Sequence, residues 1–360
     1  MHVSSASEIH KGRWRWISLL FLSLLPLLAL FHLVMWFGFT RTLFRHQTGD
    51  LKRMGYLVGF EDCKMKLKSL EPTSGYTLLM GAKDFETHQA PTMLFGDSFG
   101  ASVAMAYSIK TKEPIGLGGV NWEQGNGVSQ IKAWLAEDWF RKNGVRTIIV
   151  ERVEYAWLDT FAEEGDSRLN ISWDNELSGG QSAPYRKASA WTFANNGNFK
   201  VIFCNLAYLV SPTAFKLTET CLVRLKKKFF NCSYGDRLLF YRGDLRGALN
   251  AQNQLRLDAA LKHLQELADL CHRQGLQFYL IVPPVKSYLY YDWVDRPFYP
   301  DSKLLETLQG RAAGYVDLKQ RFHRELEAGY QDLYLPDDSH WTYPAAEMAA
   351  EELTKAKAAP

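Results

Sequence analysis

From residue 91 onward, short apolar runs alternate with stretches whose apolar residues recur every three or four positions. The short runs predict buried strands at 92–95, 146–153, 276–284 and 314–318. The periodic stretches predict helices at 98–109, 128–144, 255–275, 302–311 and 344–359. Strands that alternate with helices predict an α/β fold, in which helices cover both faces of a parallel sheet. Functional sites in such folds lie at the carboxyl ends of the strands.

The N-terminal region carries an apolar stretch, residues 16–38, without Asp, Glu, Lys or Arg. At 1.5 Å per residue this stretch can cross the hydrocarbon core of a bilayer. A cleaved signal peptide is the alternative, because three basic residues precede the stretch. However, the stretch is longer than the apolar region of a usual signal peptide, and no small-x-small cleavage site follows it. We therefore predict a single transmembrane helix that remains as an anchor.

The chain divides into four parts on this basis. We expect a cytoplasmic tail at 1–15, the anchor at 16–38, a membrane-proximal connector at 39–90 and a large domain at 91–360. Residues from about 158 to 250 lack clean periodicity, which predicts an insertion in that domain. Positive charge is nearly balanced across the anchor, but a long following domain can be translocated regardless of such charge. We place the N-terminus in the cytoplasm and the large domain outside it.

Charge and cysteine content narrow the possible partners. The 360 residues carry 42 basic and 39 acidic side chains, for a net charge of +3, so no nucleic-acid partner is expected. None of the five cysteines has the spacing of a metal site. Cys221 and Cys232 could pair as a disulfide in an exported domain, and the odd number leaves at least one thiol free.

A serine stands at the corner between the first predicted strand and helix of the large domain. The segment LFGDSFG places Ser98 where its hydroxyl can be exposed and where a helix N-terminus can face a developing oxyanion. Such a hydroxyl needs a base to attack a carbonyl, and the base needs a carboxylate to orient it. Asp337, Asp338 and His340 supply these groups just before the last predicted helix. Each motif alone is compatible with ordinary turn or capping chemistry, so the prediction rests on their combination.

Three motifs together resemble those of a known superfamily. GDSF (96–99), PPVKSYLYYDW (283–293) and DSHW (338–341) resemble the SGNH hydrolases, and most closely their alginate O-acetyltransferase, AlgX/AlgJ-like, branch. The resemblance implies a flavodoxin-like three-layer α/β/α fold with Ser98 as nucleophile, His340 as base and Asp338 as orienting acid. It also implies acyl transfer to an extracytoplasmic polysaccharide. A membrane-bound O-acyltransferase (MBOAT) would supply the acyl group, and no cofactor or metal would be needed.

The chain departs from that branch in several respects. The serine motif precedes the Asp-x-His-Trp motif, as in unpermuted SGNH esterases and in DltD-type proteins. Asp337 satisfies the older Asp-x-x-His spacing and is the alternative orienting acid. The Gly and Asn sequence blocks that help to form the oxyanion hole in the superfamily are poorly matched in this chain. The segment GLGGVNWEQGNG (116–127) offers Gly119 and Asn121 as oxyanion or substrate residues. Arg152 stands near the missing Asn block, where it could bind substrate or form a structural ion pair.

These observations predict a membrane-anchored O-acyltransferase, most simply an O-acetyltransferase, that modifies a surface or secreted polysaccharide. The implied location is a bacterial inner membrane, with the SGNH-like domain facing the periplasm. A polysaccharide acetyl esterase of the same fold and a non-catalytic polymer-binding or scaffold subunit remain as alternatives. One or two of four tryptophans in loop-like stretches could stack on sugar rings; these are Trp122, Trp157, Trp173 and Trp191.

Overall fold

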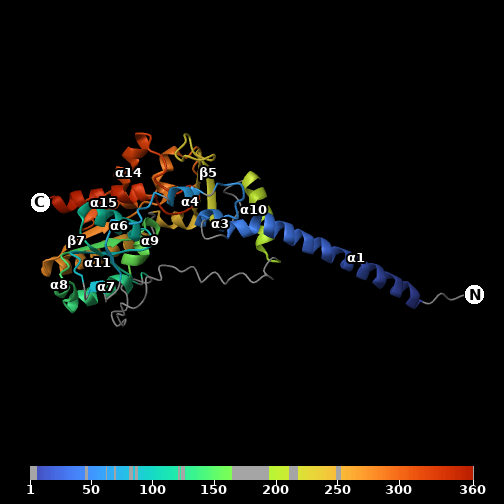
Figure 1. Ribbon diagram of the computed structural model, residues 1–360, viewed down its shortest axis with the longest axis horizontal. Helices are drawn as coiled ribbons and strands as arrows, with labels where there is room; N and C mark the ends of the chain where they lie inside the picture. The colour runs from blue at the N-terminus through green and yellow to red at the C-terminus, as the bar shows by residue number, and fades with distance from the viewer. Residues whose placement is uncertain are drawn as a thin grey trace, which may run out of the picture.

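The computed structural model of the chain has a long helix that projects from a layered α/β body (Figure 1). The residues that the structure describes are 6–44, 48–61, 63–68, 70–80, 84–85, 88–120, 122, 126–163, 194–210, 218–248 and 253–359. The projecting helix α1 (Ala6–Met35) runs on through the π-helical turn η1 (Trp36–Thr40) into α2 (Arg41–Leu43). Within it, Ser18–Leu43 is long and apolar enough to cross a membrane.

The body is built on one six-stranded sheet in which every pair of neighbours is parallel. Its order is β1-β3-β2-β4-β7-β8, with bounds β1 Leu78–Leu79, β2 Thr92–Phe95, β3 Ile115–Gly118, β4 Thr147–Glu151, β7 Gln277–Ile281 and β8 Tyr315–Val316. Leaving out the edge strand β1, this is the flavodoxin-like order, and it confirms the expected fold class. The chain leaves β2 for β3 on one side and reaches β4 on the other, so the order reverses at β2.

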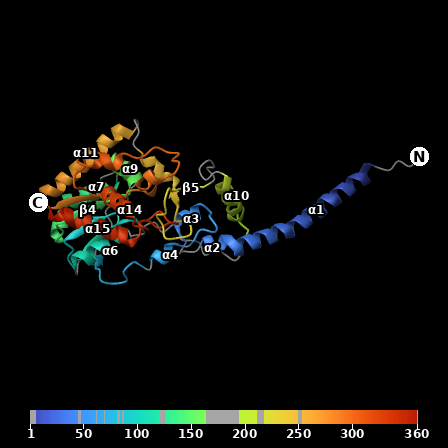
Figure 2. The same ribbon diagram turned by 90° about the horizontal axis from the view of Figure 1, so that it is seen from above.

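Helices cover both faces of the sheet (Figure 2). One face carries α6 (Gly100–Thr111), α14 (Leu318–Glu327) and α15 (Tyr343–Ala358). The other carries α7 (Asn126–Ala136), α8 (Trp139–Lys142), α9 (Glu154–Phe161) and α11 (Gln254–Arg273). Small buried residues on α15, including Ala345 and Ala349, let it pack closely against α6. The result is the three-layer arrangement that the resemblance implied.

Two departures from the predicted elements have simple backbone causes. The helix expected at 128–144 is divided into α7 and α8, because Asp138 adopts a left-handed conformation with φ of 57° between them. Strand β3 was not predicted, because two of the four residues of its sequence IGLG are glycines, which are depleted in strands. Its glycines are needed there, since a Cβ on Gly118 would lie 2.3 Å from the Phe95 ring.

The described residues of the segment expected as an insertion include a helix and a hairpin. Helix α10 (Gly197–Val210) packs beside the end of α1, and β5 (Thr220–Arg224) pairs antiparallel with β6 (Arg237–Tyr241). The hairpin shares a small core with the connector, formed by Leu51, Leu57, Phe60, Leu222 and Leu239. The connector is therefore folded against the body rather than extended between it and α1.

The remaining short elements complete the connector and the loops around the carboxyl edge of the sheet. They are α3 (Asp50–Met54), α4 (Cys63–Lys68), η3 (Arg242–Gly247), α12 (Lys286–Leu289), η5 (Tyr291–Trp293) and α13 (Leu304–Leu308). The five cysteines are free thiols, so the possible Cys221–Cys232 disulfide is not formed. Cys221 is fully buried in the hydrophobic core on β5, whereas Cys232 lies in the loop between β5 and β6 and contacts Cys63.

Candidate active site

Ser98 lies in the turn between β2 and α6, at the point where the strand order reverses. The turn is tight on its inner side, because a Cβ on Gly96 would lie 2.5 Å from the Glu151 carboxylate. Phe99 is buried directly behind the turn, whereas Ser98 is exposed. This local packing presents the hydroxyl at the carboxyl edge of the sheet, with the N-terminus of the twelve-residue helix α6 beside it.

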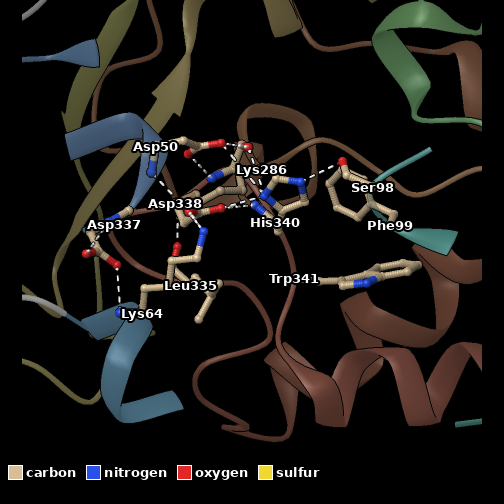
Figure 3. Close-up of polar contacts among 12 residues, drawn as sticks. Asp50, Lys64, Ser98, Phe99, Lys286, Leu335, Asp337, Asp338, His340 and Trp341 are labelled. Carbon is tan, nitrogen blue, oxygen red and sulfur yellow. Dashed lines mark hydrogen bonds and ion pairs between the residues drawn. The ribbon is translucent and has the colours of Figure 1, made fainter. Parts of the chain in front are cut away.

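The structure brings Ser98, His340 and Asp338 into one chain of hydrogen bonds (Figure 3). Nε2 of His340 lies 2.6 Å from Oγ of Ser98, and Nδ1 of His340 lies 2.5 Å from Oδ1 of Asp338. The Phe99 ring packs against the imidazole with 4.9 Å between centroids. Residues 242 positions apart in the sequence thus meet in the geometry that activates a serine hydroxyl.

The two neighbouring aspartates have different contacts. Asp338 accepts from the imidazole, whereas Asp337 accepts from the backbone N–H groups of Gly49 and Lys64. Both carboxylates are fully buried. Of the two candidate acids, Asp338 is therefore the one placed to orient His340, and Asp337 holds the connector.

The Asp338 carboxylate and the His340 imidazole shift each other's pKa. Burial would raise the pKa of Asp338, but its hydrogen bond to His340 and the charge of Lys64 outweigh burial and hold the pKa well below its ordinary value. Burial would lower the pKa of His340, but Asp338 and the nearby Asp50 outweigh it, so that pKa lies above its ordinary 6.5. An imidazolium is thus favoured when His340 takes up a proton.

Two residues of the connector belong to the site, and the sequence did not identify them. Nζ of Lys64 lies 2.6 Å from Oδ2 of Asp338, and the backbone N–H of Asp50 donates to the same oxygen over 3.0 Å. The Asp50 carboxylate accepts from the backbone N–H and the hydroxyl of Ser339. No periodic or motif signal marks Asp50 or Lys64, because their role depends only on the folding of α3 and α4 against the 337–340 loop.

Lys286 supports the loop that carries Asp338 and His340 from the interior of the protein. Its side chain is 1% exposed, and its ammonium donates to the backbone carbonyls of Leu335, Pro336 and Asp338 over 2.9–3.2 Å. Burial lowers the pKa of Lys286 to about 8, against the opposing effect of Asp338 and Asp50. The lysine of the 283–293 motif therefore holds the DSHW loop in place. This contact gives the motif a structural role that the sequence alone did not explain.

Comparison with known families agrees with this geometry. Residues 235–359 match the family model of the SGNH hydrolase-like domain of acetyltransferase AlgX. The match confirms the resemblance to the AlgX branch over about a third of the chain, a segment that includes Lys286, Asp338 and His340 but not Ser98. No curated protein matches the chain.

A buried carboxyl group lies where the SGNH superfamily would be expected to carry an asparagine block. Glu151, at the end of β4, is fully buried and accepts from the backbone N–H of Asp97 over 2.9 Å. Burial, together with the charge of Asp97, raises the pKa of Glu151 well above its ordinary value, which disfavours the charged form of this carboxyl group. Glu151 therefore supports the serine turn rather than facing the open side of the site.

The other residues that were predicted to bind substrate differ in whether they line the site. Arg152 forms the ion pair that was one of its two interpretations, with 3.1 Å between its guanidinium and Asp97, and it also lines the cavity beside Ser98. Gly119 is exposed after β3 and does not line that cavity, and Asn121 lies outside the described residues. Trp122 and Trp157 are buried and unsuited to sugar stacking, whereas Trp173 and Trp191 lie outside the described residues.

Ser98 and His340 stand between two cavities of the SGNH-like site. The serine cavity, about 350 Å³, is bounded by Arg152, Tyr155, Tyr241 and Lys286. The rear cavity, about 260 Å³, lies on the side of α6 and Trp341. A third, the outer cavity of about 790 Å³, shares Met54, Glu219 and Tyr241 with the serine cavity and extends to Lys200 on α10. The hydroxyl can thus be approached from more than one direction.

Lys286→Met tests the structural role of the buried ammonium. The substitution removes the donor to three carbonyls, and an unsatisfied buried polar group costs about 1–3 kcal/mol. We expect the free energy of unfolding to fall by roughly 3 kcal/mol or more, measured by denaturant titration of the full chain in detergent. Lys303→Met is the matched control, because that ammonium is exposed beside Asp301 and its loss should cost less than about 1 kcal/mol. Equal losses in the two variants would contradict the assigned role.

Proposed function

We propose that the protein is a membrane-anchored, extracytoplasmic O-acyltransferase that transfers an acetyl group through an acyl-serine intermediate to a hydroxyl of a surface or secreted polysaccharide. The observation that carries the proposal is the hydrogen-bonded chain from Ser98 through His340 to Asp338, beside an exposed hydroxyl and open cavities. The match to the SGNH hydrolase-like domain of acetyltransferase AlgX supports an acetyltransferase role.

In the first half-reaction, Oγ of Ser98 attacks the carbonyl carbon of the acyl donor. Nε2 of His340 accepts the hydroxyl proton over the observed 2.6 Å, and Asp338 stabilises the resulting imidazolium. The positive end of the α6 dipole lies beside the oxyanion that forms. The imidazolium then returns its proton to the leaving group of the donor, which leaves the acyl group on Ser98.

In the second half-reaction, a sugar hydroxyl replaces the departed donor. His340 takes the proton of that hydroxyl as its oxygen attacks the acyl-serine, and Ser98 recovers the proton when the ester bond to it breaks. Water in the place of the sugar would make the protein an esterase. In both steps, all proton transfers run through side chains of the protein. The serine cavity and the rear cavity, which both contain Ser98, offer separate approaches for donor and acceptor.

The location and partners belong to the same proposal. The apolar helix α1 would anchor the chain in a bacterial inner membrane, with the SGNH-like domain in the periplasm. An acetyl group that starts in the cytoplasm must then cross the membrane, which is the task of a membrane-bound O-acyltransferase. The acceptor would be a polysaccharide that passes through or remains at the cell surface.

Mass spectrometry of the intact chain tests the covalent step. Incubation of the full chain in detergent with p-nitrophenyl acetate should add one acetyl group, mapped to Ser98 by peptide analysis, and Ser98→Ala should add none. Added acetyl-acceptor oligosaccharides should speed the loss of the adduct and yield acetylated sugar. Loss of the adduct to acetate alone, at a rate that sugars do not change, would favour the esterase. A folded chain without any adduct would favour the non-catalytic alternative.

Paired substitutions of the two aspartates test the orienting acid. Acylation requires neutral His340, so its rate in the native chain should rise with pH through a pKa above 6.5. Asp338→Asn removes the charge that raises this pKa, so the midpoint should move to lower pH and the maximal rate should fall by about 10³-fold or more. Asp337→Asn should leave the midpoint in place, because Asp337 makes no hydrogen bond to His340. A shifted midpoint in Asp337→Asn alone would reverse the assignment.

A further inference from the structure

Helix α10 presents an apolar face that no described residue covers. Its large exposed side chains recur at intervals of three and four positions, so they share one side of the helix. They are Phe199, Ile202, Phe203, Leu206, Leu209 and Val210, with exposures from 36% to 82%. An apolar surface of this kind on a helix is typical of a site for lipid or protein contact rather than of a solvated surface.

The neighbouring side of α10 packs on the end of the apolar helix α1, and Phe199 at the border of the apolar face takes part in this contact. The Phe199 ring lies 4.9 Å from the Phe31 ring between centroids, and Val201 packs with Met35. Nδ2 of Asn198 lies 2.8 Å from Nδ1 of His32. Figures 1 and 2 show α10 beside this end of α1 from two directions.

The length of the apolar span places this contact within a bilayer. Ser18–Leu43 has 26 residues, whereas about 20 helical residues fill the hydrocarbon core. Whichever 20 consecutive residues of the span do so, Phe31 and His32 are among them. The part of α10 that touches these two residues must then lie at the same depth.

The pairing of His32 with Asn198 fits an apolar surrounding. A histidine inside a membrane span is costly unless another polar group satisfies it. His32 is only 8% exposed and Asn198 is fully buried, so the two polar side chains face each other and are shielded by α1 and α10. Apart from Lys200, which lines the outer cavity, the exposed residues of α10 are apolar, and their surroundings in a membrane would be acyl chains.

We propose that α10 is embedded in the lipid leaflet on the side of the SGNH-like domain, with its apolar face in contact with the acyl chains. The proposal rests on α1 spanning a membrane, which is part of the proposed function. It adds that the domain is attached to the membrane at two points, α1 and α10. Two attachments hold the domain against the bilayer, whereas a single helix would leave it free to tilt.

This placement has a consequence for access to Ser98. The outer cavity is lined by Lys200 of α10 and by Tyr56 of the connector, and it borders the serine cavity, with which it shares Met54, Glu219 and Tyr241. With α10 in the leaflet, the outer cavity opens next to the membrane surface. An acyl donor presented at that surface would therefore lie next to the cavity that contains Ser98.

Site-specific photocrosslinking in vesicles tests the contact with lipid. The full chain is reconstituted in phosphatidylcholine–phosphatidylglycerol vesicles with p-benzoyl-L-phenylalanine in place of Phe203, and adducts are identified by mass spectrometry. Leu22, 63% exposed on α1, is the reference within the span. Leu255, 82% exposed on α11 in the body, is the matched control outside it. We expect lipid adducts at Phe203 and Leu22 and none at Leu255.

The outcomes distinguish the embedding of α10 from the membrane anchoring by α1. Adducts at Leu22 without adducts at Phe203 would overturn the embedding of α10 and leave the anchor in place. Absence of adducts at both positions would overturn both. In native membranes, a cross-link from Phe203 to another protein in place of lipid would also overturn the proposal, because the apolar face would then be a protein interface.

The thiols of Cys63 and Cys232 lie close to each other although they come from distant parts of the chain. Cys63 begins α4, and Cys232 lies in the loop that joins β5 to β6. The two Sγ atoms and a carboxylate oxygen of Glu61 all lie within 4.8 Å of one another, and the thiols form a hydrogen bond. Each cysteine is on a different side of the boundary between connector and body, so a bond between them would join the two.

We infer that Cys63 and Cys232 form a disulfide when the domain faces an oxidising compartment, as the proposed function places it. Two S–H bonds break, one S–S bond forms, and two protons and two electrons leave. The electron acceptor is the disulfide of a thiol oxidoreductase, which is reduced to two thiols. Lys64 follows Cys63 directly, so the bond would secure the segment whose ammonium contacts Asp338.

The surroundings of the two thiols indicate the order of attack. Their mutual hydrogen bond, which stabilises one thiolate, lowers the pKa of Cys232 and raises the pKa of Cys63. Cys232 is also partly exposed, whereas Cys63 is buried. Cys232 is therefore the thiolate that attacks the external disulfide, and Cys63 then displaces the oxidoreductase from the mixed disulfide.

To test the disulfide, the full chain in detergent is equilibrated with a glutathione redox buffer and its peptides are mapped. The result of this experiment does not depend on the membrane side that the domain occupies. We expect a Cys63–Cys232 linked peptide, alkylation of the other three cysteines, and a lower unfolding midpoint after reduction. Cys271→Ser should keep the link, and Cys232→Ser should abolish it. A Cys221–Cys232 link, no link at all, or protection of both thiols by added Zn²⁺ would overturn the inference.

Discussion

The charge on Asp338 is the constraint on which the site depends. This carboxylate has no exposed surface, and a buried charge without partners costs several kcal/mol. The imidazole of His340, the ammonium of Lys64 and the backbone N–H of Asp50 provide the partners. Two of these three come from the connector, so the Asp338 carboxylate is satisfied only when the chain between α2 and the sheet folds back on the body.

The serine side of the site has its own support, built around Asp97. Its backbone N–H donates to the buried Glu151, and its carboxylate pairs with Arg152. These contacts fix the turn after β2, while Lys286 fixes the loop that carries His340. The distance between Ser98 and His340 is thus set by two separately braced loops that meet at the switch point of the sheet. Precise placement of this kind matters because proton transfer requires hydrogen-bond contact between the two groups.

Helices α1 and α10, the connector and the site lie in one continuous region of the structure. Helix α10 touches α1, the connector packs on the hairpin β5–β6, and the outer cavity borders the serine cavity. The insertion therefore connects the apolar helix to the SGNH-like core. Such a connection suits the proposed transfer from a donor at a membrane to a polymer outside it.

Periodicity in the sequence alone predicted most of the strand and helix alternation and the apolar N-terminal helix, because these signals are local or repeat along one element. The pairing of Ser98 with His340 was predicted from the combination of two distant motifs and their resemblance to those of the SGNH superfamily. Tertiary structure decided between Asp337 and Asp338, because both satisfy a motif spacing and only the path of the loop turns one toward the imidazole. It also brought in Asp50, Lys64 and the pairing of Asn198 with His32. Those contacts join segments far apart in the chain whose residue types are ordinary in isolation, so only folding assigns them a partner.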